Sequence, residues 1–285
     1  MSSSSAYYDD VIACRVFSTY RADHPIDLSF IIITILIILQ SDLNAGLKKV
    51  LSGDLLSLML ALMMTPLQHE AHRLRQAMEG LGTNEETLME ILCTRPAPQL
   101  KDTSAAYSEL YKKDLEKDLK GETSGDFAKL IVALLHKDNV LGVVQRDIEA
   151  LSASLDSKKT DPGLWISILT SRDADHLNRV LMRLELERGE PLEKILEKKF
   201  SGDIRMGLKT LVQCIQSPHL FLAQRLVTMK AAILHGVMVS HCEEDLLCIR
   251  AAFLKLTGTS LYTTLQKNFK GEHLQALLAI CRSED

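Results

Sequence analysis

The sequence predicts an all-α fold, an array of four helical repeats of about 70 residues in which the first repeat is incomplete. Two observations predict this fold. Apolar residues recur three and four positions apart, as on the buried face of a helix, and the same apolar positions return in phase along the chain. Strand signals are almost absent, with one isoleucine-rich run near the N-terminus as the exception.

Three stretches of the chain align with one another without gaps. Arg95 corresponds to Arg172, 77 residues later, and to His241, a further 69 residues along the chain. The same two offsets connect further positions of the first stretch to their counterparts, among them Leu100, Leu115, Leu119 and Gly125. A partial copy lies 72 residues before this stretch, over residues 42–63. Positions related by these offsets are called equivalent below.

The offsets divide the chain into five segments. We expect a divergent N-terminal segment at 1–41, a partial first repeat at 42–66, and further repeats at 67–138, 139–217 and 218–285. The repeated glycine falls between two apolar helical stretches of each copy, where a helix end or a tight turn requires positive φ. Each repeat should therefore consist of helices that bury their apolar faces on one another.

The N-terminal segment contains a continuous apolar run, Phe30–Leu39. As a helix, its ten residues would span about 15 Å, half of the hydrocarbon core of a bilayer. Asp27 and Asp42 close the run on both sides, and no small-residue cleavage site of a signal peptide follows it. A buried segment is favoured, and an alternative exon or a targeting or membrane segment stays open.

Composition and charge exclude several classes of protein. With 46% hydrophobic and 25% charged residues, the chain resembles an ordinary globular protein and not a collagenous or disordered one. A net charge of −4 argues against a nucleic-acid partner, which would require a basic surface. To bind an anionic membrane, the protein would need a local basic patch or a bridging cation. The six cysteines form no CxxC pair and are expected to be reduced, and a metal site at His241, Cys242 and Cys248 is disfavoured.

One pair of motifs in the second repeat points to a known family. Residues 78–86 read MEGLGTNEE, and residues 119–125 read LKGETSG. The pair resembles the repeat of the annexin family, in which a GxGT-[DN]-E loop is followed about 40 residues later by a carboxylate near TSG. The stretches WISILTSR and LVQCIQ are also similar to annexin sequences, and the resemblance covers the chain from about Asp42 to Asp285.

The resemblance implies a Ca²⁺ site, because calcium takes backbone carbonyls and a bidentate carboxylate as ligands. By resemblance, the ligands are the carbonyl oxygens of Met78, Gly80 and Gly82 and the side chain of Glu122. The carbonyl of Thr83 and the side chain of Glu85 would match a weaker accessory site. A purely structural interpretation stays open, in which Thr83 and Glu86 form a capping box and the glycines only end the preceding helix.

The equivalent positions of the other repeats depart from this pattern. Val50 and Lys199 stand in the first and third repeats where the second has Glu122, and Asn268 stands there in the fourth. The third repeat has KKTDPGLW in place of the glycine loop, and the loop of the fourth is about five residues shorter than the family's. A lysine at the ligand position would repel calcium. We therefore expect one intact site.

The function that the resemblance implies is calcium-dependent binding to anionic phospholipid membranes. The protein would act as a peripheral, cytoplasmic protein in membrane organisation or trafficking, with any protein partner unknown. No catalytic constellation is present, so no enzyme is expected. The alternative is a calcium-insensitive interaction scaffold, since three repeats lack the ligands.

Two smaller features complete the sequence prediction. Trp165 is expected in the core. Four lysine pairs are expected on solvated helix faces, with a secondary role at lipid headgroups left open: Lys48-Lys49, Lys112-Lys113, Lys158-Lys159 and Lys198-Lys199.

Overall fold

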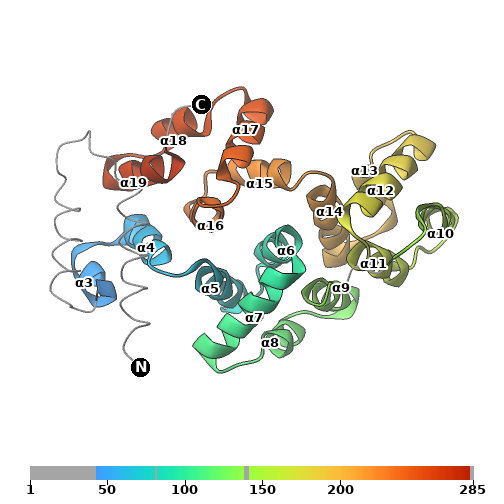
Figure 1. Ribbon diagram of the computed structural model, residues 1–285, viewed down its shortest axis with the longest axis horizontal. Coiled ribbons are helices and arrows are strands. Elements are labelled where there is room, and N and C mark those ends of the chain that lie inside the picture. The colour runs from blue at the N-terminus through green and yellow to red at the C-terminus, as the bar shows by residue number, and fades with distance from the viewer. Residues whose placement is uncertain (1–42, 81, 138–140, 283–285) are drawn as a thin grey trace. The chain divides into compact units, whose positions relative to one another are not determined.

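The computed structural model describes residues 43–80, 82–137 and 141–282 of the chain. These residues form helices and the turns between them, and no strand occurs within the described ranges (Figure 1). The all-α prediction is confirmed. The apolar run Phe30–Leu39 lies outside the described residues, as does the whole segment 1–41.

The helices occur in successive groups of the same order. The first group has two helices, α3 (Leu43–Val50) and α4 (Gly53–Leu62). The second has five, α5 (Pro66–Met78), α6 (Glu85–Thr94), α7 (Ala97–Tyr111), α8 (Leu115–Glu122) and α9 (Gly125–Leu135). The third has α10 (Val144–Asp156), α11 (Pro162–Ser171), α12 (Ala174–Arg188), α13 (Leu192–Lys199) and α14 (Gly202–Gln216). The fourth has α15 (Pro218–Leu226), α16 (Ala231–His241), α17 (Leu246–Thr257), α18 (Leu261–Asn268) and α19 (Gly271–Cys281).

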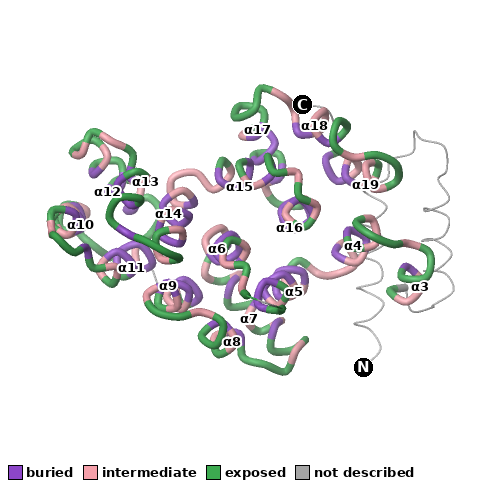
Figure 2. The backbone as a smooth tube through the Cα atoms, turned by 180° about the vertical axis from the view of Figure 1, so that it is seen from behind, coloured by how far each residue is buried: buried purple, intermediate pink, exposed green. Residues whose placement is uncertain are grey.

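These groups agree with an array of helical repeats. Apart from Pro66, each helix falls within one of the repeat limits expected from the sequence, and the limits themselves stay a prediction. The chain divides into two compact units, residues 1–69 with 223–285 and residues 70–222. Figure 2 shows buried and exposed positions on the same helices, as expected for amphipathic helices that bury one face.

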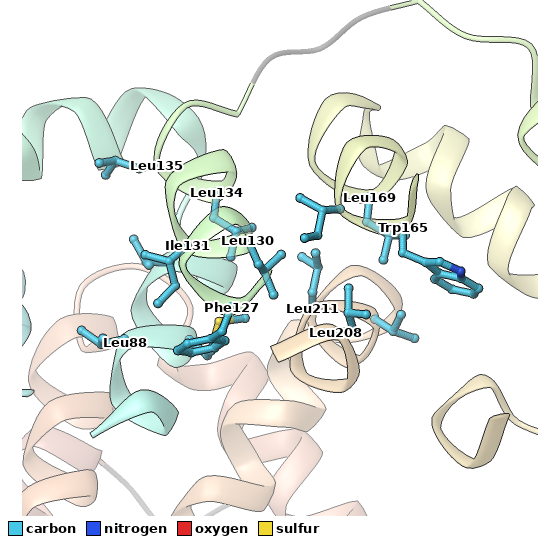
Figure 3. Packing of buried hydrophobic residues seen from close by; sticks show 14 of the residues in the cluster. Leu88, Phe127, Leu130, Ile131, Leu134, Leu135, Trp165, Leu169, Leu208 and Leu211 are labelled. Atoms are coloured by element: carbon cyan, nitrogen blue, oxygen red, sulfur yellow. The ribbon is translucent and has the colours of Figure 1, made fainter. Parts of the chain in front are cut away.

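The second unit has a continuous apolar core. Figure 3 shows Phe127 and Leu130 of α9 packed near Leu208 of α14, with Trp165 of α11 beyond. Trp165 is fully buried and meets Phe200 edge to face, with ring centroids 6.1 Å apart. The prediction that Trp165 belongs to the core is confirmed. Aromatic side chains of this size contribute much of the free energy of burial in such a core.

The repeated glycine adopts the same backbone conformation in all four groups. Its φ is 60° at Gly53, 63° at Gly125, 62° at Gly202 and 63° at Gly271. The expected positive φ is confirmed, but the glycine begins the last helix of each group and does not end the helix before it. In the second group the two residues ahead of it, Thr123 and Ser124, are extended. This turn fixes how each last helix leaves the one before it.

The first unit contains a pair of histidines in contact, of which His235 is buried and His273 is half-buried. α4 packs against α16 and α19, and the Nε2 atom of His235 in α16 lies 2.8 Å from that of His273 in α19. Burial and, to a lesser extent, the neighbouring His273 lower the pKa of His235 to about 4, although Asp54 opposes the change. The neutral form of His235 is therefore the form that the fold accommodates.

We predict that replacing Gly125 with alanine destabilises the protein. A Cβ at Gly125 meets no heavy atom within 4 Å, so its cost is the left-handed backbone alone, about 1 kcal/mol. Gly121 of α8 is the matched control, because its surroundings are equally open and its φ is not positive. There alanine should be neutral or stabilising by up to about 1 kcal/mol. Urea unfolding measures both changes, and equal changes in the two variants would contradict the assigned turn.

We also predict that stability falls on acidification through the histidine pair. The pKa of His235 is about 4 in the folded chain, against an ordinary value of 6.5. Below pH 6.5 the unfolded chain takes up a proton that the folded chain does not, so the free energy of unfolding decreases as the pH falls towards 4. The decrease should be on the order of 2 kcal/mol. Unfolding curves of wild type and His235→Gln measure it, and identical pH profiles would contradict the prediction.

Candidate functional site

The loop between α5 and α6 begins at Met78, which is buried at the end of α5. Gly80 and Gly82 have φ values of 106° and 87°, a region that side chains with a Cβ rarely adopt. A Cβ at either glycine would meet no heavy atom within 4 Å, so backbone conformation and not crowding requires glycine here. Both glycines are exposed, and Leu81 between them lies outside the described residues. The loop is therefore exposed, and its backbone adopts positive φ at two positions.

Backbone and side-chain hydrogen bonds hold the end of this loop. Asn84 is the N-cap of α6, and its side chain accepts from the backbone N–H of Thr87 at 3.0 Å. The backbone N–H of Asn84 donates to the carbonyl of Ala77 at 2.8 Å, which closes the loop onto α5. The expected cap at Thr83 is therefore wrong, because asparagine one position later takes that role. Asparagine and threonine are both preferred at N-caps, so residue type alone did not distinguish the two positions.

The hydroxyl of Thr83 connects the loop to the distant carboxylate residue. It donates to the backbone carbonyl of Glu122 at 3.1 Å, across 39 residues of sequence. Glu122 is the last residue of α8 and is exposed, and its carboxylate makes no hydrogen bond or ion pair within the described part of the chain. The two motifs found in the sequence thus lie side by side.

The charge around this loop is negative. Glu85 and Glu86 occupy the first turn of α6, and Glu122 lies across the loop. Glu79 is paired with Arg75, whose Nε lies 2.6 Å from its carboxylate. An unpaired carboxylate beside a loop with two positive-φ glycines fits a hard cation that takes carbonyl and carboxylate oxygens. The residues present therefore fit calcium.

The equivalent place in the third group is built differently. Lys199 ends α13, and its Nζ donates to the carbonyl oxygen of Ser157 at 3.5 Å. Ser157 is equivalent to Gly80, yet its φ is −68°. Among the described residues other than glycine, positive φ occurs only at Lys112, Met229 and Arg282, so this loop lacks both left-handed turns. The contact between Lys199 and the loop carbonyl was not foreseen from the sequence, which gives the residue type but not its partner.

The remaining two groups offer no comparable loop pair in the described ranges. In the fourth, residues 227–230 alone join α15 to α16, and the side chain of Asn268 donates to the carbonyl of Thr264 at 2.8 Å. In the first, Val50 holds the equivalent position with half of its surface exposed. Neither side chain provides a carboxylate for a cation.

A second cluster of ligand-type side chains lies after α16. The potential ligand atoms of His241, Glu244 and Asp245 are within 4.8 Å of one another. The Nδ1 of His241 is 2.6 Å from the carboxylate of Asp245, and the thiol of Cys242 donates to the carbonyl of Val239. Because His241 already pairs with Asp245, we assign no ion to this cluster.

Within the described ranges, every helix is too short or too polar to cross a bilayer.

Comparison with known proteins places this geometry in a family. The model of the family described as Annexin matches residues 69–134 and 146–211. Mouse annexin A6 is 35% identical over 262 residues, which are 86% of this chain and 39% of that protein. Human annexin A9 is 33% identical over 259 residues, which are 86% of this chain and 74% of that protein.

Solved structures agree with the sequence comparisons. The structure of annexin III is similar with a TM-score of 0.85 at 30% identity, covering 99% of this chain and 89% of that one. Chicken annexin V is similar with a TM-score of 0.81 at 32% identity, covering 96% and 90% of the two chains. This chain therefore spans most of annexins III, V and A9 but well under half of annexin A6.

Proposed function

Because the chain belongs to the annexin family, we propose that it binds anionic phospholipid membranes in a calcium-dependent manner through the loop pair at residues 78–83 and Glu122. The observation that carries the proposal is the hydrogen bond from Thr83 to the Glu122 carbonyl, beside an unpaired carboxylate. Members of this family generally bind phospholipid with calcium. The proposal assigns that property to one site of this chain.

The residues of the site have distinct roles. The carbonyls of Met78, Gly80 and Gly82 would provide neutral oxygens, and Glu122 the negative charge that calcium needs. A bound calcium ion supplies positive charge and open coordination positions, which water or a lipid phosphate fills. The Thr83–Glu122 hydrogen bond holds the two halves of the site together beforehand, which lowers the entropy cost of ordering them.

Two further residues belong to the proposal. The carbonyl of Thr83 and the side chain of Glu85, in the first turn of α6, would form a weaker accessory site next to the main one. Together they provide only part of a calcium coordination shell. The accessory site should therefore bind calcium only after the main site is occupied.

A single site sets the strength of attachment. Proteins with several membrane sites gain affinity by avidity, which one site cannot provide. We therefore propose easily reversed, peripheral attachment at cytoplasmic membrane faces, in membrane organisation or trafficking and without catalysis. A calcium-insensitive scaffold is the competing function, supported by the loss of ligands at Val50, Lys199 and Asn268.

We predict that Glu122→Gln weakens the calcium-dependent pelleting of the protein with vesicles that contain phosphatidylserine. The amide keeps the shape of the side chain but removes its charge, so the calcium needed for half-maximal pelleting should rise more than about ten-fold. Co-sedimentation over a calcium series, with a chelator as reference, measures this. Glu272→Gln is the matched control, since Glu272 is exposed in the first turn of α19 in the fourth group.

The control should retain the wild-type calcium dependence, because it changes net charge equally but touches no candidate ligand. If all three proteins pellet alike with calcium and with chelator, the calcium site is wrong and the scaffold function is favoured.

A further inference from the structure

The third group carries a second, oppositely charged version of the site. Lys158, Lys159 and Lys199 stand at the positions equivalent to Leu81, Gly82 and Glu122 of the calcium loop, each 77 residues later. All three lysines are exposed. The two equivalent places thus have the same position in the repeat but opposite charge.

Internal contacts already order this loop. Besides the contact between the Lys199 ammonium and the Ser157 carbonyl, the Ser157 hydroxyl lies 2.7 Å from the carbonyl oxygen of Ser154 and 2.8 Å from that of Lys159. The Thr160 hydroxyl donates to Ser154 as well, at 3.3 Å. The ammonium of Lys199 thus joins the last residue of α13 to the loop.

Neighbouring acids do not cancel the positive charge. Asp156 is bound by the guanidinium of Arg188 through contacts of 2.5 and 3.0 Å, and the carboxylate of Asp161 accepts from the backbone N–H of Gly163. Arg188 and then Lys199 hold the pKa of Asp156 below its ordinary value. Lys158 and Lys159 have no acidic partner among the described residues.

The free donors of this loop match one kind of ligand. An ammonium group has three N–H donors, and the Ser157 carbonyl uses one from Lys199. The others, with those of Lys158 and Lys159, remain for an anionic oxygen. Clustered lysines at a membrane surface each add about 1 kcal/mol of attraction to anionic lipid.

We propose that the loop pair formed by residues 157–160 and Lys199 binds the phosphate groups of anionic phospholipid without calcium. The site uses other residues than the calcium site and contributes at every calcium concentration. The chain would therefore have a constant electrostatic contact in the third repeat and a calcium-controlled contact in the second.

The test compares full-length variants in the presence of a chelator, which removes the calcium that the second-repeat site needs. The triple variant K158Q/K159Q/K199M should pellet with phosphatidylserine vesicles roughly a hundred-fold more weakly than wild type. The matched control K112Q/K113Q/K117Q removes equal charge from exposed lysines, two in the turn from α7 to α8 and one in the first turn of α8, and should pellet like wild type. K158Q/K159Q, which leaves the Lys199 contact intact, should show an intermediate loss, and circular dichroism checks that all variants are folded.

The outcomes separate the two proposals. Residual wild-type binding that is salt-sensitive, absent from phosphatidylcholine vesicles and unchanged in Glu122→Gln supports the lysine site. Absence of binding in chelator, equal binding by the triple variant, equal loss in the control, or displacement by inorganic phosphate at matched ionic strength would overturn a lipid site here. A failure of calcium dependence in the Glu122 series would bear only on the calcium site.

Discussion

The turn between the last two helices of each repeat is the constraint on which the rest of the structure depends. Its glycine has a φ between 60° and 63° in all four groups, a value that other residues reach only with strain. The residue that ends the preceding helix lies three positions before this glycine, as Glu122 does before Gly125. In the second and third groups this residue meets the loop between the first two helices. Its charge then decides what that loop can bind.

The same glycine turn, with a different residue three positions before it, accounts for the opposite charges of the second and third groups. Glu122 leaves an unpaired carboxylate beside a glycine loop, which is why we propose that this place binds a cation. In the third group, the ammonium of Lys199 itself provides the positive charge, and it contacts the loop carbonyl of Ser157 directly. The net charge of −4 does not show this contrast, because it sums the charged residues of the whole chain.

The sequence predicted the helical repeats because periodicity and equivalent positions are properties of the chain itself. The turn glycine followed from the same reasoning. The burial of Trp165 followed from its residue type, and the pairing of the two motifs from the resemblance to the annexin repeat. The identity of the N-cap did not, because Thr83 and Asn84 both suit that role and only the fold directs the Thr83 hydroxyl to Glu122. The partner of Lys199 also required the structure, since 42 residues separate it from Ser157.

The most direct test of this account is a crystal structure of the full chain grown with calcium, with ions located by anomalous scattering. The account predicts an ion between the carbonyls of Met78, Gly80 and Gly82 and the carboxylate of Glu122. It predicts none between Ser157 and Lys199, where the ammonium already occupies that place. An ion at the third loop, or none at the second under saturating calcium, would contradict it.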